Sequence, residues 1–85
     1  MSDVVVYTTE PCSFCMRVKQ LLQARGVEYT EVNLARDPAG RAQLVEQTGM
    51  MSFPQVVIRG EVLGGFQETL RADQSGRLRE LVAAA

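Results

Sequence analysis

The stretch "EPCSFCMRVK", residues 10–19, contains the only two cysteines of this 85-residue chain. Two residues separate Cys12 from Cys15, and a run typical of a helix follows them. Such a pair serves one of three purposes: a metal site, a structural disulfide or a redox centre. Both the fold and the function depend on which of these applies.

The elements around this stretch are predicted from hydrophobic periodicity and turn residues. Residues 3–8 are rich in β-branched side chains and indicate a buried strand. We expect a helix from Ser13 to Arg25, because apolar residues recur there at steps of three and four, and Gly26 stands where a helix would end. Residues 27–34 alternate apolar and polar side chains, which favours a strand with one buried face.

The second helix is predicted from its two ends. Asp37 followed by Pro38 places a capping residue before a proline at the first helical position. The helix should then run to about Thr48 and end at Gly49. It would be the second helix in a chain whose first four elements alternate between strand and helix.

A β-hairpin and a final helix complete the chain. Residues 54–65 indicate the hairpin, with a turn at Arg59-Gly60-Glu61. Residues 67–82 return to a helical pattern, although Gly76 interrupts it. The apolar residues expected on the buried side of this helix are Leu70, Leu78, Leu81 and Val82.

The predicted order is β-α-β-α-β-β-α, an α/β fold in a single domain over residues 1–85. The first two strands are joined through a helix and should be parallel, whereas the last two should be antiparallel. We therefore expect a four-stranded mixed sheet with helices on both faces.

The composition and hydrophobic pattern of the chain argue against several classes of function. The chain is 46% hydrophobic, which suffices for one core, and its net charge of −1 argues against a nucleic-acid partner. No apolar stretch is long enough to span a membrane, and the first ten residues do not read as a secretory signal. We therefore expect a cytoplasmic protein, and in that compartment a cysteine pair is more often catalytic or metal-binding than a permanent disulfide.

The metal and structural interpretations of the pair are weak. A structural zinc site needs about four ligands, and this chain offers two cysteines and no histidine. A disulfide across so short a loop restricts little of the unfolded chain. A redox centre is the favoured interpretation, and we expect no metal ligands within one chain.

The redox interpretation assigns different roles to the two sulfurs. Cys12 lies at the start of a helix, where unpaired N–H groups and the helix dipole favour a thiolate. Cys15 lies one turn further on the same side, placed to attack a mixed disulfide. We predict that Cys12 attacks and Cys15 resolves. Phe14 is interpreted as an exposed contact residue rather than a core residue, while Arg17 and Lys19 either add positive potential or are ordinary surface charges.

Two later segments would complete such a site. In "MSFPQVV", residues 50–56, a cis bond before Pro54 would hold the backbone of Phe53 toward the cysteines, where it could pair with an extended thiol peptide. In "GGFQET", residues 64–69, two glycines precede a helix start, where a carboxylate can bind. A Gly-Gly turn alone is usually only a turn.

Taken together, "VYTTEPCSFCMRVKQLLQARGVEYTEVNL" (6–34), "FPQVVI" (53–58) and "GGFQETLRADQSGRL" (64–78) resemble the glutaredoxin family along nearly the whole chain. The resemblance implies a thioredoxin fold with Pro54 in cis. It implies dithiol-disulfide exchange, with Cys12 as nucleophile and Cys15 as resolving thiol. It also implies a monomer without a tightly bound cofactor that acts on disulfide-containing proteins, with glutathione as reductant and substrate.

The resemblance also implies a glutathione site. The cysteinyl backbone of glutathione would pair with Phe53, and its γ-glutamyl carboxylate would meet the backbone around Phe66 and Gln67. Arg41 could meet the glycyl carboxylate, but an exposed helix arginine is the favoured interpretation. The expected glutathione-binding residues are Thr9, Phe14, Phe53, Pro54, Gly65, Phe66 and Gln67.

Some positions depart from the family pattern and support alternatives. Ser13 stands where proline is common, Thr9 where lysine is common, and Gln67 where an acidic residue is usual. Gly65-Phe66 is similar to the glutaredoxin-like redoxins that serve ribonucleotide reductase and are reduced by thioredoxin reductase. A function of another class is a dimeric [2Fe–2S] carrier or sensor, in which Cys12 from each chain and two glutathione thiols would supply four thiolates.

Overall fold

The computed structural model describes residues 3–83. Within them the chain forms a four-stranded sheet of order β2-β1-β3-β4, in which β1 and β2 are parallel and the pairs β1–β3 and β3–β4 are antiparallel. The predicted parallel and antiparallel pairs are both confirmed. The elements are β1 (Val4–Thr8), α1 (Ser13–Ala24), β2 (Thr30–Asn33), α2 (Pro38–Thr48), β3 (Gln55–Ile58), β4 (Glu61–Gly64), α3 (Phe66–Ser75) and α4 (Arg77–Ala83).

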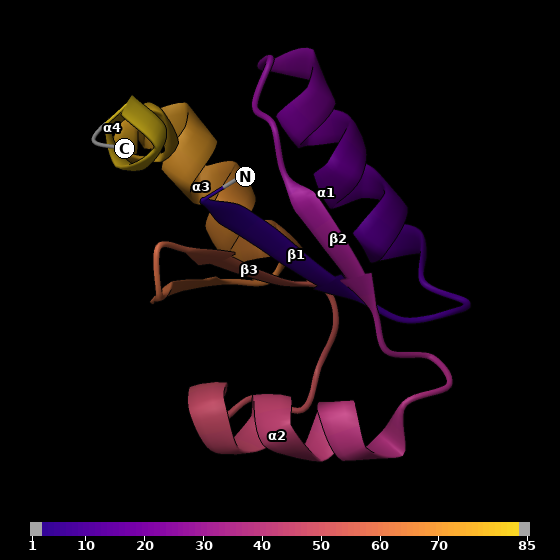
Figure 1. Ribbon diagram of the computed structural model, residues 1–85. Coiled ribbons are helices and arrows are strands. Elements are labelled where there is room, and N and C mark those ends of the chain that lie inside the picture. The colour runs from indigo at the N-terminus through magenta and orange to yellow at the C-terminus, as the bar shows by residue number, and fades with distance from the viewer. Residues whose placement is uncertain (1–2, 84–85) are drawn as a thin grey trace.

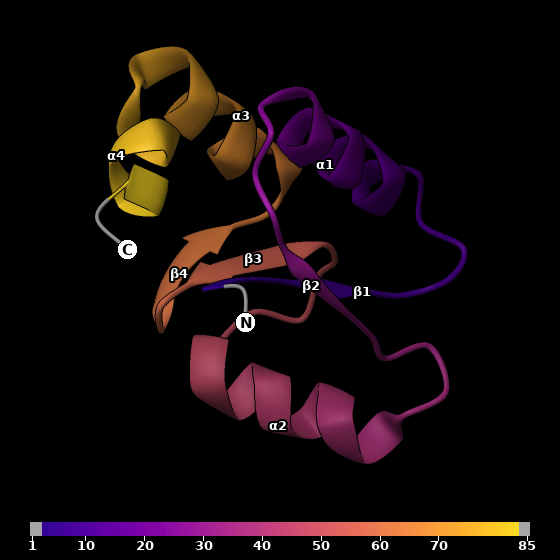
Figure 2. The same cartoon turned by 45° about the horizontal axis from the view of Figure 1, so that its top comes forward.

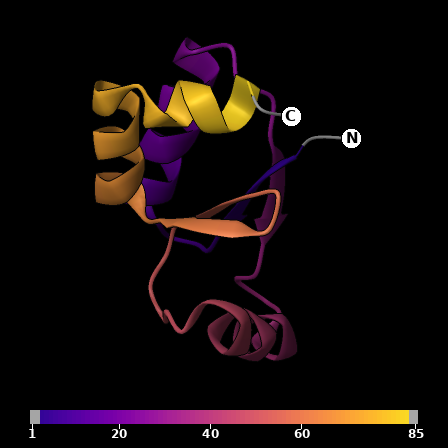
Figure 3. The same cartoon turned by 90° about the vertical axis from the view of Figure 1, so that its left-hand side faces the viewer.

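The sheet forms the middle of three layers. Helices α1, α3 and α4 cover one face and α2 covers the other, as Figures 1 and 2 show and as the edge-on view in Figure 3 makes plain. The expected helices on both faces are therefore confirmed. None of the helices among residues 3–83 has the length and apolar character needed to cross a membrane.

The main core lies between the sheet and the three-helix layer. Alternate residues of β1 point into it, so that Val4, Val6 and Thr8 are buried while Val5 and Tyr7 are half-buried. Each aliphatic side chain buried in this way stabilises the fold by about 1.5–3 kcal/mol. The core residues are Val4, Val6, Val18, Leu22, Val56, Ile58, Ala72 and Leu78.

The end of α1 determines where β2 begins. Gly26 adopts a left-handed φ of 68°, and the N–H of Val27 donates to the carbonyl of Leu22 at 2.9 Å. Because Val27 satisfies the helix end instead of joining the sheet, β2 starts only at Thr30. The predicted strand over residues 27–34 was thus too long.

Helix α2 has the predicted ends. The carboxylate of Asp37 accepts a hydrogen bond from the N–H of Gly40 at 2.9 Å, and Pro38 occupies the first turn. Gly49 closes the helix in the left-handed conformation, with its N–H on the carbonyl of Val45. These local capping signals are confirmed.

The hairpin turn is tighter than predicted. Arg59 and Gly60 have φ values of 49° and 83°, and Glu61 already pairs with Ile58 as the first residue of β4. Positive φ at both central residues suits the twist of a two-residue hairpin loop. Glu61 therefore belongs to the strand and not to the turn.

The last helical segment is two helices instead of one. Gly76 has φ 86° and ends α3, and α4 starts at the next residue. A left-handed glycine is a common helix end, and here it redirects the chain. Of the residues expected on the buried side, Leu78 is buried in the core, whereas Leu70 is only half-buried and Thr69 and Ala72 face inward in its place.

Candidate active site

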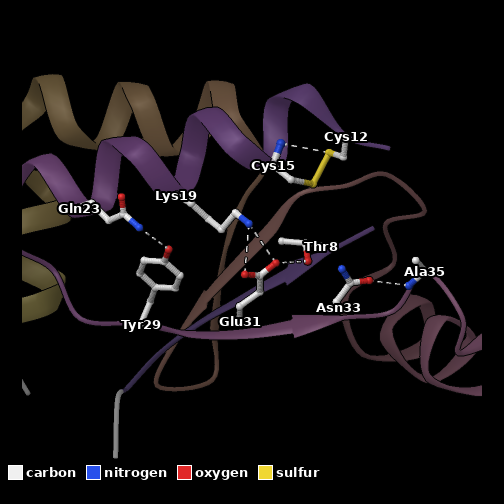
Figure 4. Close-up of polar contacts among 9 residues, drawn as sticks. All are labelled: Thr8, Cys12, Cys15, Lys19, Gln23, Tyr29, Glu31, Asn33 and Ala35. Carbon is white, nitrogen blue, oxygen red and sulfur yellow. Dashed lines mark hydrogen bonds and ion pairs between the residues drawn. A yellow bond between two sulfur atoms is a disulfide. The ribbon is translucent and has the colours of Figure 1, made fainter. Parts of the chain in front are cut away.

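The two cysteines form a disulfide at the start of α1, with their Cα atoms 5.3 Å apart. Cys12 is the N-cap residue in an extended conformation, and its Sγ accepts a hydrogen bond from the N–H of Cys15 at 3.0 Å (Figure 4). A sulfur thus occupies the position in which a capping oxygen usually satisfies the first helical N–H groups. The same N–H would stabilise negative charge on this sulfur after reduction.

The two sulfurs differ in accessibility. Cys12 is half-buried, whereas Cys15 is only 2% exposed. An incoming thiol or disulfide can therefore approach Cys12 more easily. The arrangement suits thiol-disulfide exchange that begins at Cys12 and ends with Cys15.

The loop before β3 is held by a buried side chain. The Nε2 of Gln55 donates to the carbonyls of Met50 and Ser52 at 3.0 and 2.9 Å, and Gln55 is 1% exposed. Its Oε1 has no hydrogen-bond partner among the described residues. The peptide bond between Phe53 and Pro54 is cis, as the resemblance implied.

The start of α3 lies against this loop and requires a glycine at position 64. Gly64 has φ 123°, and a Cβ there would lie 2.8 Å from the Cγ of Glu68. A Cβ on Gly65 would lie 3.4 Å from the carbonyl oxygen of Pro54. The carboxylate of Glu68 accepts the N–H of Gly65 at 2.7 Å, so the acidic side chain closes the first turn.

A hollow of about 150 Å³, here called the Phe53 hollow, lies between this loop and α3. Phe14 stacks on Phe66 at its rim, with ring centroids 5.8 Å apart, and the Arg17 guanidinium lies 5.4 Å from the centroid of the Phe14 ring. Phe14 is 47% exposed, which confirms that it is not a core residue, while its contact with a substrate stays a prediction. The hollow is lined by Phe14, Ser52, Phe53, Pro54, Gly65, Phe66, Gln67 and Glu68.

Thr9 is the one predicted glutathione-binding residue that does not line the Phe53 hollow. It lines a second hollow of about 520 Å³, here called the Cys15 hollow, which both cysteines also line. The predicted residues are thus divided between two hollows. The Cys15 hollow is lined by Thr8, Thr9, Glu10, Pro11, Cys12, Ser13, Cys15, Met16, Lys19, Glu31 and Asn33.

The Cys15 hollow contains a polar cluster of Thr8, Lys19 and Glu31, of which the sequence analysis singled out only Lys19. The hydroxyl of Thr8 donates to Oε2 of Glu31 at 2.8 Å, and the Nζ of Lys19 lies 3.1 and 3.2 Å from the two carboxylate oxygens (Figure 4). The hydrogen bond from Thr8, with the help of Lys19, lowers the pKa of Glu31 although partial burial acts the other way. One signal was available in the sequence: Lys19 follows Cys15 by four residues and so shares its helix face.

Arg41 is partly buried, and its side chain hydrogen-bonds to the backbone. Its Nη1 donates to the carbonyls of Leu34 and Ala35 at 2.6 and 3.0 Å, and the residue is half-buried. The preferred interpretation as an ordinary exposed arginine was therefore wrong. Arg41 braces the end of β2, and it also lines a hollow of about 280 Å³ beside Phe53 and Gln55.

Comparisons with known proteins cover nearly the whole chain, including the cysteine pair and the loop before β3. A family model described as Glutaredoxin matches residues 4–63. The glutaredoxin of Pseudomonas aeruginosa is 37% identical over 84 residues, covering 99% of this chain and 100% of that protein, and glutaredoxin 3 of Escherichia coli K12 is 32% identical over 82 residues, covering 96% and 99%. The crystal structure of a buckwheat glutaredoxin-glutathione complex matches with a TM-score of 0.88 at 28% identity, covering 96% of this chain and 77% of that chain.

Proposed function

Because this chain belongs to the glutaredoxin family, and is thus a thiol-disulfide oxidoreductase with the thioredoxin fold, we propose that it reduces protein disulfides and glutathione mixed disulfides in the cytoplasm, with glutathione as its reductant. One observation carries the proposal. The more accessible sulfur of the pair caps α1, and Phe14, which stands between the two cysteines, lines the Phe53 hollow.

The reaction begins at Cys12. After reduction, its thiolate attacks a glutathionylated protein, the protein thiol leaves and takes up a proton, and a disulfide between Cys12 and glutathione remains. A second glutathione thiolate then attacks the glutathione sulfur, which releases oxidised glutathione and restores the Cys12 thiolate. The N–H of Cys15, 3.0 Å from the Cys12 sulfur, stabilises this thiolate as attacking and as leaving group.

Protein disulfides need the second cysteine. Attack by Cys12 leaves a mixed disulfide with the substrate, and the Cys15 thiolate then attacks the Cys12 sulfur. The second substrate thiol is expelled, so the substrate gains two electrons while the Cys12–Cys15 pair loses two. Two glutathione molecules then reduce the pair and leave as oxidised glutathione.

The Phe53 hollow is the proposed glutathione site. The cysteinyl backbone of glutathione pairs with the backbone of Phe53 in the manner of strand addition. Its γ-glutamyl carboxylate binds at the first turn of α3, where the N–H groups of Phe66 and Gln67 have no acceptor within the helix. Support for this part comes from the lining of the hollow and from the buckwheat relative, which was solved as a glutathione complex.

The choice of reductant is the test of this proposal. The oxidised protein would be mixed with reduced glutathione, glutathione reductase and NADPH, or with thioredoxin reductase and NADPH, and NADPH consumption followed with a disulfide substrate. We expect turnover with glutathione. Turnover with thioredoxin reductase alone would instead support a redoxin that serves ribonucleotide reductase, the alternative suggested by the similarity of Gly65-Phe66 to those redoxins.

A further inference from the structure

We propose that Lys19 and Glu31 balance each other's charge beside Cys15, and that this balance sets the pH range over which Cys15 resolves mixed disulfides. This inference rests on the proposed roles of Cys12 and Cys15. It concerns residues that play no part in the glutathione site described above. Glu31 would act through its charge, as a positioning residue for Lys19, and not by contact with the substrate.

The pair lies in the same hollow as the buried sulfur. Lys19 follows Cys15 by one helical turn on the same face of α1, and Glu31 reaches it from β2 (Figure 4). All three residues line the Cys15 hollow. The side chains of Lys19 and Glu31 are 27% and 33% exposed and their hydrogen bonds lie at the surface, so solvent screens the two charges in part.

The position of Glu31 is held from the opposite side by a buried hydroxyl. Thr8 is 1% exposed, and it donates to Oε2 at 2.8 Å. The carboxylate is thus fixed between Thr8 and the ammonium group. Among the residues that line the Cys15 hollow, the only other charged side chain is Glu10, which is exposed; Arg17, on the same helix, lies over the Phe14 ring.

The resolving step gives this charge arrangement a role. In the mixed disulfide of Cys12 with a thiol, Cys15 must lose its proton to water in the hollow before its sulfur attacks Cys12. A bond forms between the two cysteine sulfurs, the bond to the substrate sulfur breaks, and the departing thiolate takes up a proton. Burial disfavours the Cys15 thiolate, a nearby ammonium favours it, and a nearby carboxylate disfavours it.

With both partners present, the two charges largely offset each other at Cys15. Removal of one partner should therefore shift the ionisation of this thiol in a direction set by the charge that remains. Glu31→Gln leaves the ammonium unpaired and should favour the thiolate. Lys19→Met leaves the carboxylate unpaired and should disfavour it.

The experiment is a pH-jump measurement of the resolving step. The mixed disulfide of Cys12 with glutathione would be formed in acid, and the release of glutathione timed after jumps to a series of pH values. We expect the pH at half-maximal rate to fall in Glu31→Gln and to rise in Lys19→Met, each by roughly half a unit, below the range for close unscreened pairs. The double variant should return toward the parent value.

Two controls separate this effect from general damage. Glu61→Gln breaks the exposed ion pair of Glu61 with Arg77, 2.9 Å long and outside the Cys15 hollow, and should leave the profile unchanged. Circular dichroism would establish that each variant is folded. A profile that stays in place, or that shifts in the same direction in both single variants, would overturn the inference. If the parent protein released glutathione no faster than Cys15→Ser, the proposed function would fail instead.

Discussion

The two cysteines share one disulfide but differ in what surrounds them. The Cys12 sulfur is the helix cap and is partly open to solvent, whereas Cys15 is buried against the sheet-facing side of α1. An exposed, hydrogen-bonded sulfur suits attack and departure, while a buried one suits a reaction within the molecule. This difference makes the outcomes of the two cysteine substitutions distinct.

Cys12→Ser should abolish all exchange activity, because the attacking thiolate is gone. Cys15→Ser should lose the reduction of protein disulfides, which needs an internal resolving thiol, but retain some removal of glutathione from mixed disulfides. Assays with a protein disulfide and with a glutathionylated peptide would compare the two variants. Equal loss in both variants and both assays would contradict the assigned roles.

Thr9 lines the Cys15 hollow together with Cys12. Because many glutaredoxins carry lysine at this position, we propose that a cation here would meet a carboxylate of bound glutathione. Thr9→Lys should therefore lower the apparent KM for a glutathionylated peptide with little change in kcat. A charge-assisted hydrogen bond contributes about 1.5–3 kcal/mol when shielded and less when exposed, so we expect a decrease of about threefold. Thr9→Met, of similar length but uncharged, is the control, and an equal decrease with methionine would show that charge is not the cause.

At the scale of elements, one loop and the starts of two helices form the Phe53 hollow. The loop of residues 50–54 is held from both ends: Gln55 of the next strand donates to two of its carbonyls, and the N–H of Met50 donates to the hydroxyl of Thr48 at 3.1 Å. Helix α3 closes against the same loop through its Gly64-Gly65 start. The proposed glutathione site therefore depends in part on one buried amide, that of Gln55.

Gln55→Leu should loosen this loop. The substitution removes two hydrogen bonds to carbonyls but also removes the unpartnered Oε1, so we expect a net destabilisation of only about 1–2 kcal/mol. The KM for a glutathionylated peptide should rise by more than kcat falls, because Cys12 and its helix cap are untouched. Urea unfolding and steady-state kinetics would measure both effects. An unchanged KM in a destabilised variant would show that Gln55 serves stability alone.

A bidentate ion pair joins Arg25, the C-cap residue of α1, to Asp73 of α3. Arg25 donates through Nε and Nη2 to the two oxygens of Asp73, at 2.7 and 2.9 Å. The hydrogen bonds from Arg25 lower the pKa of Asp73. A carboxyl with a lowered pKa stabilises the folded state above its unfolded pKa of about 3.9, and this contribution is lost as the pH falls through the folded value.

Asp73→Asn should therefore lower the thermal stability of the protein slightly at pH 7, and the difference from the parent should disappear on acidification below pH about 4. Salt should reduce the difference as well, because the Arg25 side chain is exposed. Melting curves over a pH series would measure this. Glu46→Gln on the exposed side of α2 is the control, and a difference that persists in acid would rule out the ion pair as its origin.

For the molecule as a whole, each chain presents one accessible cysteine sulfur, that of Cys12, because Cys15 is buried. Among residues 3–83, no group of three or more cysteine, histidine or acidic side chains is arranged to hold a metal ion. A [2Fe–2S] cluster would therefore need Cys12 from two chains and two external thiols, as the carrier alternative supposes. Ser13, which stands where many glutaredoxins carry proline, directly follows Cys12, and the carrier alternative proposes that it eases the approach of a second chain.

As a reductase, the protein should remain a colourless monomer after anaerobic incubation with iron, sulfide and glutathione. Size-exclusion chromatography with absorbance detection would measure both properties, and Cys12→Ser would serve as the control for non-specific iron binding. A coloured dimer that requires Cys12 and glutathione would instead support the carrier or sensor function.

Much of this architecture could be predicted because its causes lie within a few residues. Asp37, Pro38 and Gly49 determine α2 through caps that bond to neighbouring residues. The β-branched run of β1 and the cysteine spacing at the start of α1 are equally local. Where local cues competed, prediction was less accurate: Val27 caps a helix instead of extending a strand, and Gly76 ends one helix where the apolar pattern continues into the next.

The sequence by itself determined the alternation of strands and helices, the position of the cysteine pair at a helix start, and the candidate residues of the Phe53 hollow. Only the tertiary structure decided that Glu31 meets Thr8 and Lys19, that Phe66 stacks on Phe14, and that Arg41 braces β2. Thr8 and Glu31 are 23 residues apart in the chain, and no periodicity within either strand indicates which side chain will oppose it. Such pairs arise from the register of β1 on β2 and from the packing of α1 against the sheet. Both of these depend on burial of the whole core and not on any single segment of the chain.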